Sequence, residues 1–257
     1  MIITEKILYP AFTGDEERKL YIYLPPEYDS NPDRRYPVLY MFDGHNVFFD
    51  THATYGKSWG LGDYLDRTGT PLIVAALECH HGPNGERISE YSPYRFSDET
   101  FGTVIGRGDE TMQYFLHELK PRIDRTYRTH PDREHTFIAG SSMGGLMSLY
   151  AVLHYNAYFS RCAALSPSIF LCYKKMQTLI RTCRTAPDTT IYMDLGTEEM
   201  TMEGGSANAF ANFGKLIINK DIALTQRVIA GGRHCEASWE KQIPIFINVL
   251  LYENPQY

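Results

Sequence analysis

The sequence has few features of a membrane, nucleic-acid-binding or disulfide-stabilised protein. It contains no uninterrupted apolar stretch of about 18 residues, the length that a helix needs to cross a bilayer, so we expect no membrane-spanning segment. Its 25 lysines and arginines are outnumbered by 31 aspartates and glutamates, which gives a formal net charge of -6. No run of basic residues is present to follow a phosphate backbone, so nucleic acid is not an expected partner.

Cysteines are scarce, and the first residues carry no export signal. The five cysteines are an odd number that cannot all pair within the chain. Their placement in strand-like and helix-like segments predicts buried thiols in a reducing compartment. The segment from Met1 to Lys6 shows no basic region followed by an apolar core and a small-residue cleavage site. We therefore expect a cytoplasmic protein, and the sequence does not decide between a monomer and a homo-oligomer. The cysteines are Cys79, Cys162, Cys172, Cys183 and Cys235.

What the sequence does contain is an alternation of strand-like and helix-like segments from Ile2 to Leu251. A chain of 257 residues, 43% of them hydrophobic, is long enough to bury a substantial core. The alternation predicts an α/β fold with a mainly parallel sheet, helices on both faces, and antiparallel strands contributed by the first residues. No repeat or low-complexity tract divides the chain. We therefore expect a single domain over residues 1–257, without a large cap domain.

A serine flanked by glycines is the most informative local feature. The segment Gly-Ser-Ser-Met-Gly at residues 140–144 follows an apolar, strand-like run and precedes apolar residues at helical spacing. This is the G-x-S-x-G nucleophile elbow. Because Gly140 and Gly144 lack a Cβ, the strand and the helix can approach closely, while Ser142 adopts a strained turn that exposes its Oγ. Ser142 is therefore the candidate nucleophile.

A serine nucleophile needs a base that takes its proton and an acid that orients the base. His234 follows the strand-like segment Ala223–Ile229 and two glycines, and it precedes a helix-like segment from Ile243 to Leu251. In that position its side chain can lean over the edge of the sheet. The chain order of serine, acid and histidine is the order that accompanies this elbow. His234 is therefore the candidate base.

The acid is expected near the end of the strand-like segment Ile191–Leu195, where three carboxylates lie close together in the sequence. Asp194 falls within the strand, which would hold its side chain near the sheet. Glu198 and Glu199 follow in the loop beyond the strand. Reach therefore favours Glu199, with Glu198 and Asp194 as the alternatives.

Segments spread over nearly the whole chain resemble a known family. The segments are residues 36–46, 87–93, 115–121 with 127–129, the elbow, 165–168, Gly196-Thr197-x-Glu199 and His234-x-Glu236-x-x-Trp239. They are similar to the esterase D-like group of α/β-hydrolases, which includes feruloyl and acetylxylan esterases, siderophore trilactone esterases and mycolyltransferases. The resemblance implies the α/β-hydrolase fold, action on ester bonds, no cofactor, and an acid at the end of the Gly-Thr-x-Glu motif, which is Glu199.

An oxyanion hole is needed to stabilise the charge that develops in the transition state, and backbone N–H groups are its usual donors. One donor follows the nucleophile, at Met143. The other is expected in the loop after the strand-like segment Val38–Phe42. The family resemblance implies Gly44 or His45 for this second donor, without choosing between them.

Side chains around this loop are candidates for substrate contact. Asp43, His45 and Asn46 either hold the loop in shape through hydrogen bonds or contact the substrate directly. Tyr55 and Trp59 lie beyond the loop and are candidates for a pocket wall, with packing in the core as the alternative.

Charged residues and histidines follow the next strand-like segment, Leu72–Leu77. Ligands bind at the carboxyl edge of open α/β sheets, so Arg87 is a candidate for substrate recognition. An ion pair between Arg87 and Glu90, three residues apart, that pins the loop is the favoured interpretation. His80 and His81 lack the spacing of a recognised metal site, and no metal is predicted from them.

The sequence therefore predicts a serine carboxylesterase that forms an acyl-enzyme on Ser142. We expect short or aromatic acyl esters of small molecules or carbohydrates, because tyrosine suits sugar faces and phenolic groups and no lid-sized insertion is present. One alternative is an acyltransferase that uses the same acyl-enzyme. The other is a non-enzymatic binding module on a hydrolase fold, against which the intact Ser142, Glu199 and His234 argue.

Overall fold

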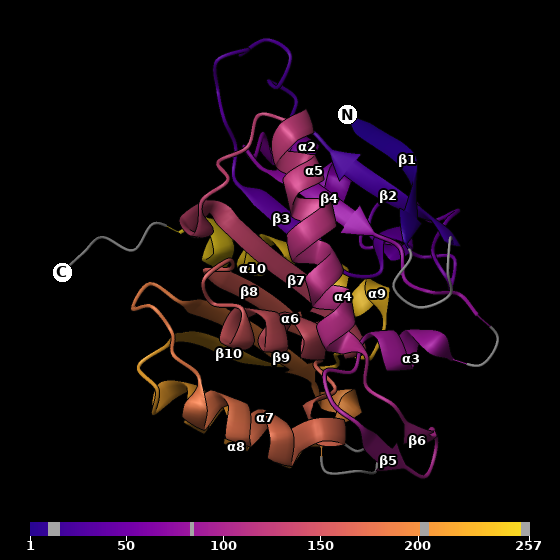
Figure 1. Cartoon of the computed structure of the whole chain (residues 1–257), viewed down its shortest axis with the longest axis vertical. Coiled ribbons are helices and arrows are strands. Elements are labelled where there is room, and N and C mark those ends of the chain that lie inside the picture. Colours follow the sequence, from indigo (N-terminus) through magenta and orange to yellow (C-terminus); the bar gives the residue numbers. More distant parts are fainter. Residues whose placement is uncertain (10–15, 83–84, 201–205, 253–257) are drawn as a thin grey trace.

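The computed structural model describes residues 1–9, 16–82, 85–200 and 206–252, and its centre is an eight-stranded sheet of order β1-β2-β4-β3-β7-β8-β9-β10 (Figure 1). The pairs β1–β2 and β2–β4 are antiparallel, and the other neighbours in the sheet are parallel. The predicted mainly parallel sheet with antiparallel strands at its start is confirmed. The strands are β1 (Ile2–Tyr9), β2 (Glu16–Tyr23), β3 (Val38–Met41), β4 (Ile73–Leu77), β7 (Thr136–Ser141), β8 (Arg161–Leu165), β9 (Thr190–Gly196) and β10 (Ala223–Ile229).

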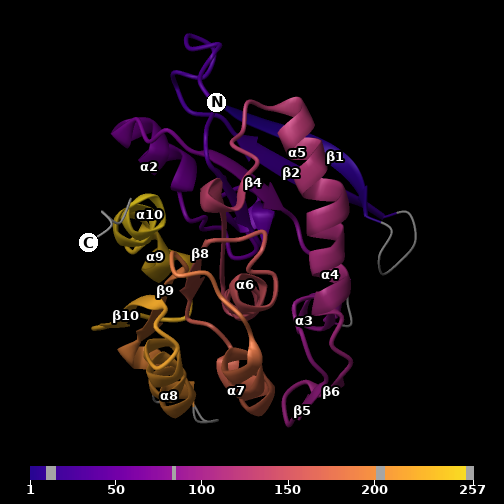
Figure 2. The same cartoon turned by 60° about the vertical axis from the view of Figure 1, so that its left-hand side comes forward.

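Helices cover both faces of this sheet (Figures 1 and 2). One face is covered by α4 (Gly108–Tyr114), α5 (Lys120–Thr126), α6 (Met143–His154), α7 (Tyr173–Thr182) and α8 (Ser206–Ile218), with the π-helix η2 (Phe115–Leu119) between α4 and α5. The other face is covered by α2 (Leu61–Thr68), α9 (Glu236–Glu240) and α10 (Ile243–Leu251). Between β4 and α4 the chain adds only α3 (Glu86–Glu90) and a small hairpin of β5 (Phe96–Asp98) and β6 (Gly102–Val104). No large cap domain stands over the sheet in the described part of the chain.

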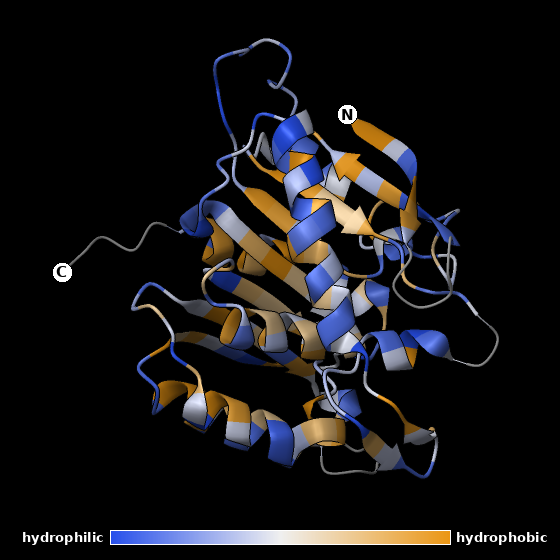
Figure 3. Ribbon diagram, in the orientation of Figure 1, coloured by the Kyte–Doolittle hydropathy of each residue, from blue (hydrophilic) through white to orange (hydrophobic). Residues whose placement is uncertain are grey.

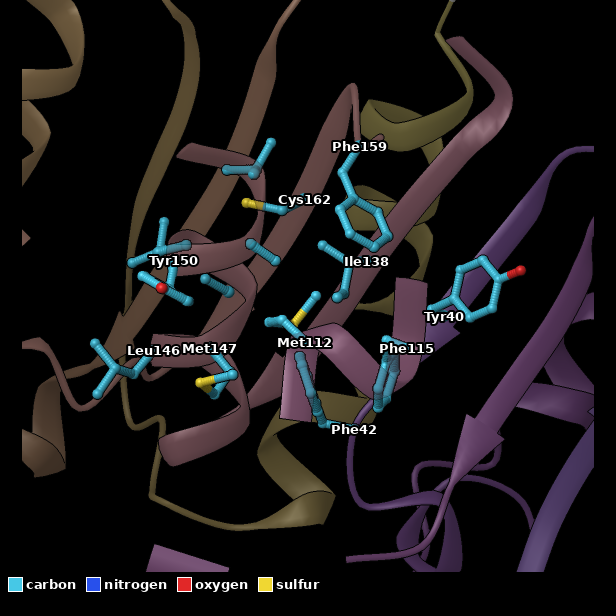
Figure 4. Close-up of a cluster of buried hydrophobic side chains, with 14 of the residues drawn as sticks. Tyr40, Phe42, Met112, Phe115, Ile138, Leu146, Met147, Tyr150, Phe159 and Cys162 are labelled. Carbon is cyan, nitrogen blue, oxygen red and sulfur yellow. The ribbon is translucent and has the colours of Figure 1, made fainter. Parts of the chain in front are cut away.

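Two apolar cores lie on the two faces of the sheet. Strands β3, β4 and β7 are buried along their whole length, which explains why they are continuous apolar runs in the sequence. Along β3, Val38 and Tyr40 belong to one core, whereas Leu39 and Met41 belong to the other. Figure 3 shows these strands in apolar colours and mixed colours on the helices. Figure 4 shows the larger core, where Phe42 and Phe115 lie near Ile138.

Neither a membrane-spanning helix nor a disulfide is found in the described residues. None of the helices in residues 1–9, 16–82, 85–200 and 206–252 is both long enough and apolar enough to cross a bilayer. All five cysteines fall within these residues and carry free thiols. Cys79, Cys162 and Cys172 are buried, as predicted, but the prediction is wrong for Cys183 and Cys235, which are half-buried.

The parallel strands bring six loops to one edge of the sheet. Strands β3, β4, β7, β8, β9 and β10 all run in the same direction, so the segments that follow them meet at their carboxyl ends. These segments contain the single-turn helix η1 (Gly44–Asn46), α3, Ser142, the helical turn η4 (Ile169–Cys172), the turn η5 (Thr197–Glu199) and His234. The candidate residues of the sequence analysis are therefore gathered at this edge.

Candidate active site

Ser142 occupies a sharp turn between β7 and α6. Its φ of 58° and ψ of −121° lie outside the regions that a residue with a side chain normally adopts, and its N–H donates to the carbonyl of Leu165 at 2.9 Å. A Cβ on Gly140 would lie 2.7 Å from the carbonyl carbon of Gly144, so only glycine fits there. The local geometry of the predicted elbow is present. It leaves Ser142 partly exposed directly before the first residue of α6.

The Glu199 carboxylate contacts the His234 ring from the end of β9. Its Oε2 lies 2.6 Å from Nδ1 of His234. Its Oε1 accepts hydrogen bonds from the hydroxyl of Ser166 at 2.7 Å and from the N–H of Gly196 at 2.9 Å. The indole N–H of Trp239 donates to the same Ser166 hydroxyl at 2.9 Å. A proton on Nδ1 that is held by Glu199 leaves Nε2 as the basic nitrogen of the ring.

Hydrogen bonding determines the charge of Glu199. Burial alone would raise the pKa of this carboxyl, but the hydrogen bonds from His234, Ser166 and Gly196 outweigh burial and lower its pKa below the ordinary value. The side chain is therefore a carboxylate at neutral pH, although its residue is only 4% exposed.

The two alternative acids, Asp194 and Glu198, have different surroundings from Glu199. Asp194 is buried within β9, where it accepts hydrogen bonds from the hydroxyl of Tyr192 at 2.7 Å and from the N–H of Ser166 at 3.2 Å. Burial raises the pKa of Asp194 to about 7. Glu198 is exposed. Of the three carboxylates, Glu199 is the one in hydrogen-bonding contact with His234.

Two lobes of one cleft meet at Ser142, His234 and Ile88. The first, the apolar lobe, has a volume of about 260 Å³. Its other apolar lining residues are Phe101, Met143, Pro167, Phe170, Leu171 and Leu195. The second, the polar lobe, has a volume of about 600 Å³. Its polar lining includes Asp43, His45, Asn46, Tyr55, Arg87 and Glu236.

An ion pair between the buried Asp43 and the half-buried Arg87 fixes the loop after β3. Nε and Nη2 of Arg87 donate to the two carboxylate oxygens of Asp43, each at 2.6 Å. Burial would raise the pKa of Asp43, but Arg87 outweighs it and lowers that pKa. The predicted Arg87–Glu90 ion pair is wrong, because Glu90 instead pairs with Arg18 of β2 at 2.6 Å. Arg87 and Glu90 each pair with a residue of another strand or loop, because the sheet brings these segments together.

Backbone and side-chain contacts also hold η1 in place. Asp43 has a φ of 57°, and its N–H donates to the hydroxyl of Tyr91 at 3.2 Å. A Cβ on Gly44 would lie 2.3 Å from the carbonyl oxygen of Ala76, so this turn is pressed against β4. The carbonyl of the Asn46 side chain accepts the N–H of Thr54 at 2.9 Å. The side chains of Asp43 and Asn46 thus hold the loop, and a further contact with substrate stays a prediction.

The oxyanion donors stay a prediction as well. Met143 is the first residue of α6, and the first N–H groups of a helix have no partner within that helix. A Cβ on Gly144 would lie 3.4 Å from Oδ2 of Asp43, so the start of α6 packs against the loop that carries Gly44 and His45. Both predicted donor segments therefore border Ser142.

The two aromatic candidates for the pocket wall differ in their exposure to solvent. Tyr55 is 82% exposed and lines the polar lobe. Trp59 is 2% exposed, and its ring packs against Trp239 and Phe246 with centroids 5.9 and 6.0 Å away. Trp59 therefore does not form a pocket wall, because the helices of that face enclose it in the core.

Sequence reasoning left several site residues without a role. Ser166 orients Glu199, and its φ of 44° lies in the left-handed region. Phe170 lines the apolar lobe, and Glu236 lines the polar lobe from the first position of α9. The segments around Ser166 and Glu236 stood out as family-like, but their partners lie far away in the sequence, so no local signal assigned their contacts.

Comparison with known proteins shows the family. Residues 13–245 match the family described as "Putative esterase". The chain is 25% identical over 190 residues to the uncharacterized protein YbbA of Bacillus subtilis, covering 71% of this chain and 69% of YbbA. It is 28% identical over 172 residues to the ferri-bacillibactin esterase BesA of Bacillus subtilis, covering 60% of this chain and 55% of BesA. An IroE-like serine hydrolase from Shewanella oneidensis has a TM-score of 0.75 at 16% identity, covering 97% of this chain and 79% of that one.

These similarities agree with the observed architecture. The family match runs from just before β2 into α10 and so includes the strands and loops that form the cleft. The structural similarity extends over nearly the whole chain and indicates the same sheet-and-helix arrangement. The chain therefore belongs to the "Putative esterase" family, has the α/β-hydrolase fold and is a hydrolase that acts on ester bonds.

Proposed function

We propose that the protein is a serine carboxylesterase that works through an acyl-enzyme on Ser142. The observation that carries this proposal is the 2.6 Å contact between Glu199 and His234 in a cleft that also contains Ser142 in a strained turn. Nε2 of His234 takes the proton of Ser142 as its Oγ attacks the ester carbonyl. Glu199 holds the ring in the required tautomer and stabilises the imidazolium that forms.

The amides of Met143 and of Gly44 or His45 receive the negative oxygen of the tetrahedral intermediate. The intermediate collapses when the C–O bond to the alcohol breaks, and His234 gives its proton to the departing oxygen. Water then attacks the acyl-enzyme by the same steps, with His234 again taking the proton. The products are the acid, the alcohol and the restored Ser142 hydroxyl.

The two lobes divide the ester between them. The apolar lobe, about 260 Å³ in volume, suits a short or aromatic acyl group. The polar lobe, about 600 Å³ in volume, suits an alcohol with several hydrogen-bonding groups, either a small molecule or a carbohydrate. BesA, a relative named a ferri-bacillibactin esterase, supports a small-molecule ester as the substrate. The five free thiols support a cytoplasmic location.

The first test is the nucleophile. Ser142→Ala is expected to lower kcat for p-nitrophenyl acetate by about 10⁴-fold or more while the melting temperature is kept. A fluorophosphonate probe is expected to label the wild-type protein at Ser142, as read by peptide mass spectrometry. The matched control is Ser168→Ala, whose hydroxyl lies 3.5 Å from that of Ser142. Substantial hydrolysis by folded Ser142→Ala protein would refute the acyl-enzyme mechanism.

The second test is the substrate. We expect higher kcat/KM for acetyl, benzoyl and cinnamoyl esters than for long-chain esters, because the small apolar lobe cannot accept a long chain. Rates that rise steadily beyond an eight-carbon acyl chain would contradict this. The same assays with an added sugar or alcohol acceptor separate hydrolysis from acyl transfer, since only transfer yields a new ester.

A further inference from the structure

Three metal-ligating side chains converge in the wall of the polar lobe, outside the Ser142–His234–Glu199 group. His45 lies in η1 after β3, and Cys79 and His81 follow β4. Because β3 and β4 are neighbouring parallel strands, the loops that follow them meet at the same edge. One ligand atom from each of the three residues lies within 4.8 Å of the other two. Ligand atoms around a tetrahedral zinc ion are about 3.3–3.6 Å apart, so a small closure of the three side chains would bring them to this spacing.

The His45 ring has a buried nitrogen that the fold leaves unsatisfied. The residue is 4% exposed, and its Nε2 lies 3.0 Å from the hydroxyl of Thr54. Its Nδ1 is buried, and no described residue forms a hydrogen bond with it. Buried polar atoms nearly always have a partner, and a bound ion is one explanation for an exception. A histidine that ligates a metal through one nitrogen commonly bonds a protein oxygen through the other, as His45 does with Thr54.

The other two residues supply a second imidazole and a thiol. His81 is half exposed, and its ring centroid lies 4.4 Å from that of His45. Its Nε2 lies 3.3 Å from a carboxylate oxygen of Glu78, which leaves Nδ1 of His81 for a metal. Cys79 is 2% exposed. The exposed side of His81 provides the path by which an ion would enter.

We propose that His45, Cys79 and His81 form a binding site for a thiophilic divalent cation, with Zn²⁺ the best match. Two imidazoles and one thiolate are a preferred ligand set for Zn²⁺, and a water molecule in the polar lobe completes a tetrahedron. Binding forms a bond between the metal and the sulfur of Cys79 and releases the thiol proton to solvent. Resting on the proposed function, an ion bound here occupies the lobe beside Ser142 and inhibits ester hydrolysis.

Binding is tested without any measurement of activity. Chelator-treated wild-type protein is titrated with Co²⁺, which is expected to give a thiolate-to-cobalt charge-transfer band that saturates at one equivalent. Cys79→Ser is expected to abolish the band, and His81→Ala to weaken Zn²⁺ affinity, measured by calorimetry, by more than about tenfold. The matched controls are Cys183→Ser, a half-buried thiol elsewhere, and His135→Ala, in a separate His130–Asp132–His135 cluster. An unchanged band in Cys79→Ser, or a loss of binding in His135→Ala alone, would overturn the site.

Inhibition is tested separately. The rate of ester hydrolysis at increasing Zn²⁺ is compared between wild type and His81→Ala, each relative to its own metal-free rate. Wild type is expected to lose activity over the Zn²⁺ range that fills the site, and His81→Ala to need more than about tenfold higher Zn²⁺. Equal inhibition of both proteins would refute the inhibitory role. Absence of any hydrolysis by the metal-free enzyme would refute the proposed function, and the cobalt titration would still decide the site.

Discussion

The two lobes of the cleft share Ser142 and His234 but are built in different ways. The side that carries the apolar lobe is placed by local motifs: a glycine-flanked turn holds Ser142, and the turn after β9 holds Glu199 against the N–H of Gly196. The side that carries the polar lobe depends on ion pairs between distant segments: the buried pair of Arg18 with Glu90, and the buried Asp43 with the half-buried Arg87. The turns that hold Ser142 and Glu199 are therefore encoded locally, whereas the two ion pairs exist only once the sheet has formed.

This difference predicts different consequences of mutation. Changes to the side that carries the apolar lobe are expected to lower the rate of ester hydrolysis while the fold survives, because Ser142 and His234 contribute little to packing. Changes to the polar side are expected to lower stability as well, because an unpaired buried charge is costly.

After the loss of the Ser142 nucleophile, the largest effect is expected at the acid. Glu199→Gln keeps the size of the side chain and removes the charge that stabilises the His234 imidazolium, so kcat is expected to fall about 10³-fold or more while KM changes little. Glu198→Gln and Asp194→Asn are the matched controls and are expected to keep kcat within a few-fold. Steady-state kinetics with p-nitrophenyl acetate measures all three.

Two other outcomes would reassign the acid. If Glu199→Gln keeps its rate while one control loses several hundred-fold, the residue that orients His234 is the control residue. If all three variants keep their rates, the site works as a Ser142–His234 dyad.

The next effect is expected at the ion pair of the polar side. Arg87→Met leaves the buried carboxylate of Asp43 without its partner, so the free energy of unfolding is expected to fall by about 3–5 kcal/mol. Urea unfolding measures this change. The double variant with Asp43→Asn is expected to recover part of the loss, because the unpaired charge is then gone.

Lys6→Met is the control for this prediction. It breaks an ion pair between two exposed side chains, and its unfolding midpoint is expected to match that of the wild type. An equal loss of stability in Lys6→Met and Arg87→Met would contradict the distinction between buried and exposed pairs.

The difference between local turns and contacts of distant segments also explains how much of the structure could be predicted from the sequence. The expected segments Ala223–Ile229 and Ile243–Leu251 coincide with β10 and α10, because apolar patterns that define strands and helices are local. Reach along the chain likewise favoured Glu199 over Asp194. The partner of Arg87 and the burial of Trp59 could not be predicted, because they depend on which strands and helices become neighbours. Asp43, 44 positions before Arg87, has no feature that marks it as the partner.

A smaller effect, dependent on pH, is expected at the carboxyl of Asp194. The pKa of Asp194 is raised to about 7 by burial, whereas that of an unfolded aspartate is about 4. Between these values the folded protein binds more protons than the unfolded chain, so stability falls as the pH rises from about 4 to 7 and stays low above 7. The part of this cost that develops between pH 5 and pH 8 is about 3 kcal/mol.

Asparagine at this position is neutral at every pH. Its carbonyl can accept the N–H of Ser166, and its amide group can donate to the hydroxyl of Tyr192. Asp194→Asn is therefore expected to raise the melting temperature relative to wild type more at pH 8 than at pH 5. Asp33→Asn, at an exposed position, is the control and is expected to show no such dependence. An equal difference between wild type and Asp194→Asn at both pH values would show that burial does not control this carboxyl.

The smallest effect is expected where the two lobes contact the substrate, and it tests their assignment. Phe170→Ala removes an aromatic ring from the apolar lobe, so kcat/KM for p-nitrophenyl benzoate is expected to fall about tenfold, with little change for the acetate. Tyr55→Ala, in the polar lobe, is the matched control and is expected to leave this acyl preference unchanged. The reverse pattern, with Tyr55→Ala altering the preference and Phe170→Ala leaving it, would place the acyl group in the polar lobe. The alcohol would then occupy the apolar side, and the division of the ester between the two lobes would be inverted.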